Sequence, residues 1–197
     1  MTEITEHTDL RDKGHADPKV DALPAAIEQF VLQWGDLGNH WGVNRSIAQI
    51  HALLYIQEQP LTADEIVTHL NIARSNVSNS LRELLGWQLI SRVPIRGDRR
   101  DHYTAEKDMW TMLMRIAAGR KAREIDPAKA ALERCVADAK ADKTISKKAL
   151  TRLNEMLIFM TALDSWYEQM LTLSKGQLTA LVKLGSKVVS ILGRRKT

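Results

Sequence analysis

The chain has 197 residues, of which 44% are hydrophobic and 26% are charged, so it is long enough to fold around a buried core. No apolar run approaches the roughly 20 residues that a membrane-spanning helix needs, and the polar N-terminus does not resemble a signal peptide. Its single cysteine excludes an intramolecular disulfide. These features exclude a membrane protein and a disulfide-rich secreted protein, and they predict a cytoplasmic one.

Charge is distributed unevenly along the chain, whose net charge is +4. Residues 1–73 contain four basic and eleven acidic side chains, residues 74–104 contain six basic and three acidic, and residues 105–197 contain eighteen basic and ten acidic. An excess of positive charge from residue 74 onward is expected of a protein with a phosphate-bearing partner. The distribution therefore favours nucleic acid as the partner.

Two helices are predicted before the first recognisable motif. Residues 1–22 are polar and lack hydrophobic periodicity, which predicts a flexible N-terminal arm. Pro24 can occupy the first turn of a helix over 25–37. Asn44 can cap a second helix over 45–59, on which the next segment would pack.

Residues 61–85 have the pattern of a helix-turn-helix. Thr62 and Glu65 have the spacing of a capping box, which opens a helix. A second helix is predicted over 74–85, with its apolar residues on one side. Its other face carries side chains of the kinds that bind DNA bases and phosphates: Arg74, Ser75, Asn76, Ser78, Asn79 and Arg82. We expect Arg74, Asn76 and Asn79 to contact bases, and the others to contact phosphates.

The next segment predicts a β-hairpin, or wing, with three arginines at its tip. Strand-forming residues in 88–95 and 101–105 flank the turn pair Gly97-Asp98. The arginines suit insertion beside the DNA backbone or into a narrow minor groove, and they are Arg96, Arg99 and Arg100. We expect Asp98 to orient one of these arginines rather than to contact DNA.

Each of these features alone has a simpler interpretation, because a polar helix face is usually solvated and hairpin arginines are usually surface charge. Together, in the order helix, turn, helix, strand, turn, strand over about 45 residues, they predict a winged helix that binds double-stranded DNA. The alternative is a protein-interaction module that keeps a winged-helix scaffold without sequence-specific DNA binding.

Three segments resemble the GbsR-type branch of the MarR family of transcriptional regulators: residues 41–55, 75–84 and 97–103. The resemblance implies a winged-helix fold, a homodimer, and repression or activation at a pseudo-palindromic operator. The sequence departs from that pattern at Asn44, near which a proline is expected, and at Ala73, near which a serine-type cap is expected.

The remainder of the chain predicts further helices. The first covers 107–125 and ends at Asp126-Pro127, a second covers 128–141, and the longest covers 146–173 before a last helix. The longest helix has two adjoining apolar stripes, which predicts burial on two sides.

We therefore expect a mainly α fold in three parts. They are a flexible arm over 1–22, a winged helix with its two-stranded β-wing and preceding helix over 23–106, and a helical dimerisation region over 107–197. Two-fold symmetry would let two recognition helices read successive major grooves roughly 34 Å apart.

A small-molecule effector is a further hypothesis. Some GbsR-type regulators sense choline-like compounds, and a quaternary ammonium group fits an aromatic cage with a carboxylate nearby. The candidate residues for such a pocket are Trp34, Trp41, Trp110, Asp164, Trp166 and Tyr167. The alternative is that these aromatic residues are core, and that Asp164 pairs with a basic residue.

Catalysis and cofactor binding have no support in the sequence. It contains no nucleophile elbow, P-loop or HExxH motif, and its six histidines lack metal-ligand spacing. The sequence therefore predicts a protein that is not an enzyme and that needs no cofactor or metal.

Overall fold

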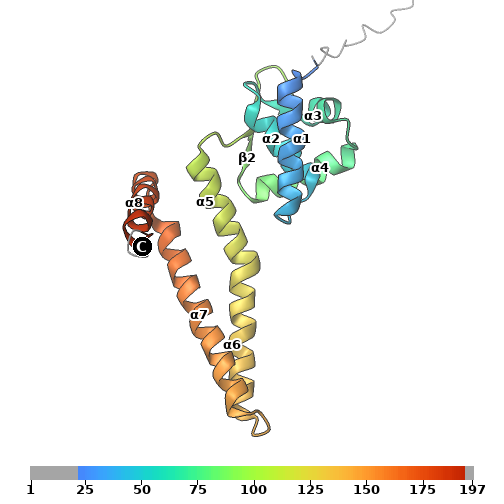
Figure 1. Ribbon diagram of the computed structural model, residues 1–197. Helices are drawn as coiled ribbons and strands as arrows, with labels where there is room; N and C mark the ends of the chain where they lie inside the picture. The colour runs from blue at the N-terminus through green and yellow to red at the C-terminus, as the bar shows by residue number, and fades with distance from the viewer. Residues whose placement is uncertain (1–21, 194–197) are drawn as a thin grey trace, which may run out of the picture.

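The computed structural model describes the backbone of residues 22–193 and the side chains of residues 22–185. A winged-helix unit is followed by a long helical arm that extends away from it (Figure 1). The predicted N-terminal arm, residues 1–22, lies outside the described residues except for Ala22.

Four helices and three short strands form the winged-helix unit: α1 (Ala25–His40), α2 (Arg45–Ile56), β1 (Leu61–Thr62), α3 (Ala63–Leu70), α4 (Arg74–Gly86), β2 (Ile90–Val93) and β3 (His102–Ala105). The predicted capping box is confirmed at the start of α3. The N–H of Glu65 donates to the Thr62 hydroxyl at 3.3 Å, and the N–H of Thr62 donates to the Glu65 carboxylate at 2.6 Å.

The three strands form an antiparallel sheet in the order β1-β3-β2. The hairpin of β2 and β3 is the predicted wing, with Ile90 opposite Ala105 and Val93 opposite His102. β1 was not predicted, because two residues are too few to show a strand period. It pairs Leu61 with Tyr103 and so ties the base of the wing to the start of α3.

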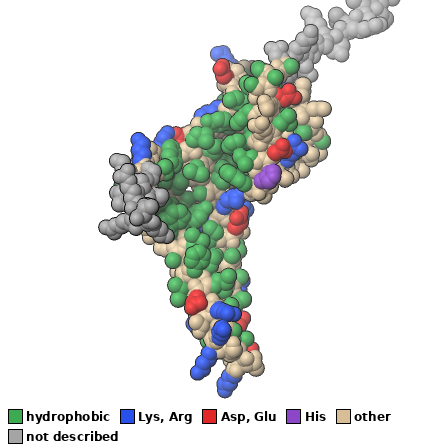
Figure 2. Space-filling model, in the orientation of Figure 1, with side chains coloured by type: hydrophobic (Ala, Val, Ile, Leu, Met, Phe, Trp, Pro, Cys, Tyr) green, Lys and Arg blue, Asp and Glu red, His purple; other side chains and the backbone are tan. Residues whose placement is uncertain are grey.

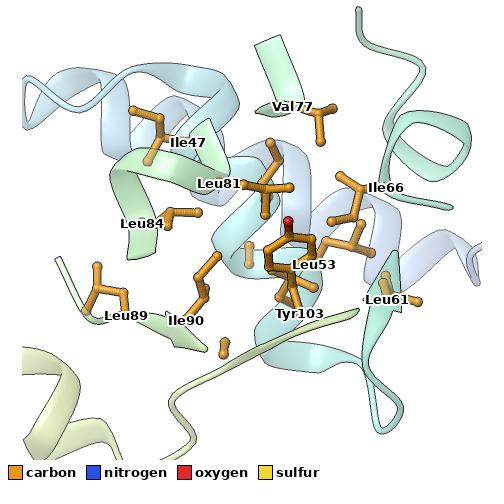
Figure 3. Packing of buried hydrophobic residues seen from close by; sticks show 14 of the residues in the cluster. Ile47, Leu53, Leu61, Ile66, Val77, Leu81, Leu84, Leu89, Ile90 and Tyr103 are labelled. Atoms are coloured by element: carbon orange, nitrogen blue, oxygen red, sulfur yellow. The ribbon is translucent and has the colours of Figure 1, made fainter. Parts of the chain in front are cut away.

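Helix α2 is the centre of the core. All eight residues from 47 to 54 are buried, and Figure 3 shows Leu53 among side chains from α3, α4 and the sheet. Gly35 and Gly38 let α1 lie close against α2, because a Cβ on either would come within 2.5 Å of an α2 side chain. This packing explains why α1 continues to His40, beyond its predicted end.

The arm consists of α5 (Met109–Arg120), a π-helical turn (Lys121–Ile125), α6 (Asp126–Ala141) and α7 (Lys147–Thr172), and α8 (Lys175–Gly193) follows it. The predicted break at Asp126-Pro127 is wrong, because the helix continues through it. Inside a regular α-helix, the ring of a proline such as Pro127 would clash with the carbonyl four residues earlier, so the helix must adjust locally. The π-helical turn lies at that point and is closed by the N–H of Asp126 donating to the carbonyl of Lys121.

One side of α7 packs against α6, while the other is left uncovered by the residues that the structure describes. Asp164 is the only buried residue of α7, and the side chains of Met156, Phe159 and Trp166 are 59%, 65% and 53% exposed. Figure 2 shows hydrophobic side chains along the arm and around its junction with the winged helix. The predicted burial of α7 on two sides is therefore not met within the described part of the chain. No described helix is both long and apolar enough to cross a membrane.

Candidate nucleic-acid interface

Helix α4 presents the predicted polar face to solvent. It starts at Arg74, after an Ala73 cap that makes no side-chain hydrogen bond. Val77, Leu81 and Leu84 are at most 3% exposed and anchor its apolar side in the core. The six side chains predicted to contact DNA are all exposed: Arg74, Ser75, Asn76, Ser78, Asn79 and Arg82.

Two arginines of this face are held by neighbouring side chains. Arg74 forms an ion pair with Asp64 of α3, and Arg82 donates to the Asn79 amide oxygen at 3.2 Å. Both interactions are exposed, and exposed ion pairs contribute little to stability. A DNA phosphate or base could therefore replace these partners at small cost.

The wing tip is organised by Asp98, as predicted. Gly97 adopts a φ of +87°, which places the turn in the left-handed region that favours glycine. Asp98 accepts the Arg100 backbone N–H at 2.9 Å and the Arg100 Nη2 at 2.6 Å, and these bonds hold the pKa of Asp98 well below its usual range. Arg96 and Arg99 are exposed and have no ion-pair partner in the described part of the chain.

A polar concavity of about 190 Å³ lies where the N-terminus of α2 meets α4. Its lining residues are Asn44, Ser46, Ile47, Asn76, Asn79, Ser80 and Glu83. The sequence predicts only a helix cap at Asn44 and no role for Ser46. No local pattern could have joined them to α4, because the two segments are about 30 residues apart and meet only in the fold.

An apolar pocket of about 220 Å³ lies between α1, α2 and the start of α5. Its lining residues are Phe30, Trp34, His51, Ala52, Tyr55, Met109 and Met112. Burial, followed by the nearby charge of Lys107, lowers the pKa of His51 to about 4, so its ring is neutral near pH 7. The buried Nε2 of His51 has no hydrogen-bond partner among the described residues.

The residues predicted for a cation cage do not meet within one chain. Trp34 lines the apolar pocket, whereas Trp110 lines a groove between α5 and α8, and Trp41 is 64% exposed. Trp166 and Tyr167 contact each other edge to face on α7. Asp164 pairs with Lys121 and Lys129, which is the alternative that the sequence left open.

The model of the MarR family matches residues 41–101, which run from the end of α1 to the wing tip. This segment of the chain is a MarR-family domain. The resemblance inferred from the sequence is therefore confirmed, and a member of this family of transcriptional regulators is not an enzyme.

Sequence similarity to two proteins of Bacillus subtilis (strain 168) extends beyond residues 41–101. This chain is 21% identical to the HTH-type transcriptional repressor GbsR over 161 residues, which cover 78% of this chain and 88% of GbsR. It is 18% identical to the HTH-type transcriptional repressor OpcR, over 70% of this chain and 76% of OpcR. Both alignments therefore reach into the helical arm.

A solved structure shares the fold. A crystal structure of a transcriptional regulator superposes with a TM-score of 0.57 and 17% identity, and it covers 79% of this chain and 99% of that one. The similarity supports the winged helix with its attached helices as the fold of this chain.

Proposed function

We propose that this MarR-family protein is a cytoplasmic transcriptional repressor that binds a pseudo-palindromic operator as a homodimer. The observation that carries this proposal is the exposed polar face of α4, which lies on the same unit as a wing whose Arg96 and Arg99 are unpaired among the described residues. Asn and Arg side chains on such a helix can read base edges, and wing arginines can bind phosphates or a narrow minor groove. Repression, rather than activation, is supported by the similarity to GbsR and OpcR, which are both named transcriptional repressors.

A second copy of the chain is the proposed partner of the uncovered apolar surface. Phe159 and Trp166 on α7 and Val182 on α8 are each more than half exposed. Contiguous exposed apolar surface on a globular protein commonly marks an interface. We assign dimerisation to residues 107–197 with a contribution from α1, and DNA binding to the winged helix within residues 23–106.

We further propose that the apolar pocket between α1, α2 and α5 receives an effector. The pocket lies at the junction of the winged helix with the arm, so an occupant would contact both. The unpartnered His51 Nε2 offers one hydrogen bond, and the Lys107 ammonium, 5.6 Å from the centre of the Tyr55 ring, disfavours a second cation. An uncharged aromatic compound fits this chemistry better than choline does.

The effector proposal is tested by titrating phenol and choline separately while the tryptophan fluorescence of the protein is followed. We expect phenol to change the emission of the wild type and choline to have no effect. The matched variant Ala52→Leu fills the pocket and should abolish the phenol response. A response to choline alone would contradict the proposed effector class.

The alternative function is a protein-interaction module without sequence-specific DNA binding. Fluorescence anisotropy separates the two functions, with DNA from upstream of the protein's own gene compared with scrambled DNA across a salt series. A specific regulator that uses this site binds the upstream DNA more tightly, and its affinity falls steeply with salt. Equal, weak binding of both duplexes would favour the interaction module.

A further inference from the structure

The N-terminus of α2 opens onto the polar concavity that it shares with α4. Asn44 caps this helix by accepting the N–H of Ser46 at 2.8 Å. The N–H groups of Arg45 and Ile47 have no acceptor among the described residues. Because the first N–H groups of a helix have no partners within it, they carry partial positive charge and attract anions.

Ser80 provides an independent indication of a ligand in the same concavity. It is only 5% exposed and lines the concavity from α4, yet its hydroxyl has no hydrogen-bond partner in the part of the chain that the structure describes. The hydroxyl oxygen is open to the concavity rather than sealed in the core, so it can donate to a ligand that enters there. Asn76 and Asn79 line the same wall and can donate through their amide groups.

We propose that this concavity binds one phosphate of the DNA backbone, so that the N-terminus of α2 clamps the duplex while α4 lies in the major groove. The inference rests on the proposed function, because it adds a contact to the same DNA interface. The concavity shares Asn76 and Asn79 with the DNA-facing side of α4, which favours a phosphate of bound DNA over a free anion.

The charges around the concavity set the strength of the clamp. Arg82 lies beside it through its hydrogen bond to Asn79, whereas Arg45 pairs with Asp36 of α1 at 3.2 Å. Glu83 is the only carboxylate in the lining, and it opposes an anion. The site is therefore a phosphate site of moderate strength that the removal of Glu83 would strengthen.

The substitution Ser46→Asp tests the clamp without weakening the helix. An acidic residue in the first turn favours a helix, so the melting temperature is expected to stay at or above that of the wild type. Its carboxylate would repel the phosphate, and we expect DNA binding to weaken by about tenfold while the salt slope falls by about 0.9 per subunit. Ser46→Asn is the matched neutral control and should bind DNA nearly as the wild type does.

Two further measurements complete the test. Glu83→Gln should tighten binding to every duplex, because it removes the only carboxylate from the concavity. In duplexes that carry single neutral methylphosphonates, the wild type should lose affinity at each contacted phosphate, and Ser46→Asp should lose nothing more at one of these positions in each half-site, the clamped phosphate.

Wild-type affinity and salt slope in Ser46→Asp would overturn the clamp. That result differs from failure of the proposed function, in which the wild type itself would show no salt-dependent DNA binding. Inorganic phosphate distinguishes a free anion from the DNA backbone. If phosphate raises the melting temperature of the wild type but the methylphosphonate scan shows no position at which Ser46→Asp and the wild type differ, the DNA clamp is overturned.

Discussion

Lys121 in the π-helical turn and Asp164 on α7 form an ion pair on the buried side of the arm, with Nζ and Oδ1 2.7 Å apart. Lys129 on α6 donates to the second carboxylate oxygen, also at 2.7 Å. The two lysines hold the pKa of Asp164 below its usual range, and Asp126 with Asp164 raises the pKa of Lys121. One carboxylate therefore fixes the register of α7 against the helix that carries the π-helical turn.

The first prediction is that Asp164→Asn destabilises the arm. The change leaves two ammonium groups facing a neutral amide, and breaking one partner of a buried ion pair is more costly than replacing the whole pair by apolar residues. We expect the melting temperature to fall by roughly 5 °C or more. Replacing Lys121, Lys129 and Asp164 together by Met, Met and Leu should recover most of that loss. A triple variant no more stable than Asp164→Asn would contradict this explanation.

The second prediction concerns Lys107, which joins the arm to the winged helix. Its Nζ donates to the carbonyl oxygens of Leu54, Tyr55 and Gln57 at 2.8, 2.6 and 2.9 Å, at the end of α2. A cation at a helix C-terminus satisfies carbonyls that have no other donor.

Lys107→Met should therefore lower the free energy of unfolding by about 1–2 kcal/mol, as measured in urea. Lys143→Met makes the same change at an exposed loop lysine and should have almost no effect. Equal stability of the two variants would show that the lysine does not fix the junction.

The third prediction is a pH dependence that His51 causes. Its folded-state pKa of about 4 lies below the ordinary 6.5, so the unfolded chain takes up the proton first as the pH falls. Stability from this group is therefore unchanged above about pH 6.5, declines between pH 6.5 and 4, and is flat below. The total decline is at most about 3 kcal/mol.

Urea unfolding of the wild type and of His51→Phe across this pH range measures the contribution. The difference between the two free energies of unfolding should change with pH only in that window. A difference that stays constant from pH 7 to pH 4 would mean that His51 ionises equally in both states.

The sequence was most informative where the signals are local. The Thr62–Glu65 capping box, the apolar side of α4 and the Gly97-Asp98 turn each depend on residues within a few positions, and the structure has all three. By contrast, the continuous helix through Pro127 depends on a backbone adjustment that composition does not reveal.

Features built from distant segments could not be predicted from the sequence. The concavity needs Ser46 and Ser80 on two helices, and the apolar pocket needs Trp34 and Met109 across the whole winged helix. A basic partner for Asp164 was one of two alternatives, but the sequence could not name its lysines, which lie 35 and 43 positions earlier. Periodicity shows which face a residue occupies and does not show what that face meets.

The fourth prediction tests the homodimer through the exposed stripe of α7. Phe159→Glu places a charge on this apolar surface, so we expect a protein that is monomeric in analytical ultracentrifugation and binds DNA much more weakly. Gln169→Glu adds the same charge at an exposed polar position of the same helix and should remain dimeric. A dimeric Phe159→Glu protein would place the interface elsewhere.

The fifth prediction separates base reading from phosphate binding within the proposed interface. Asn79→Ala should reduce the preference for operator over scrambled DNA, because an asparagine amide can discriminate adenine by about 1–3 kcal/mol. Arg99→Ala should instead weaken binding to both duplexes by a similar factor and reduce the salt slope by about 1 per subunit.

Arg100 is held by Asp98, so Arg100→Ala should disturb the shape of the wing and lower the melting temperature as well. Anisotropy on both duplexes over a salt series measures all three variants, and the same loss of preference in Asn79→Ala and Arg99→Ala would contradict this division of roles.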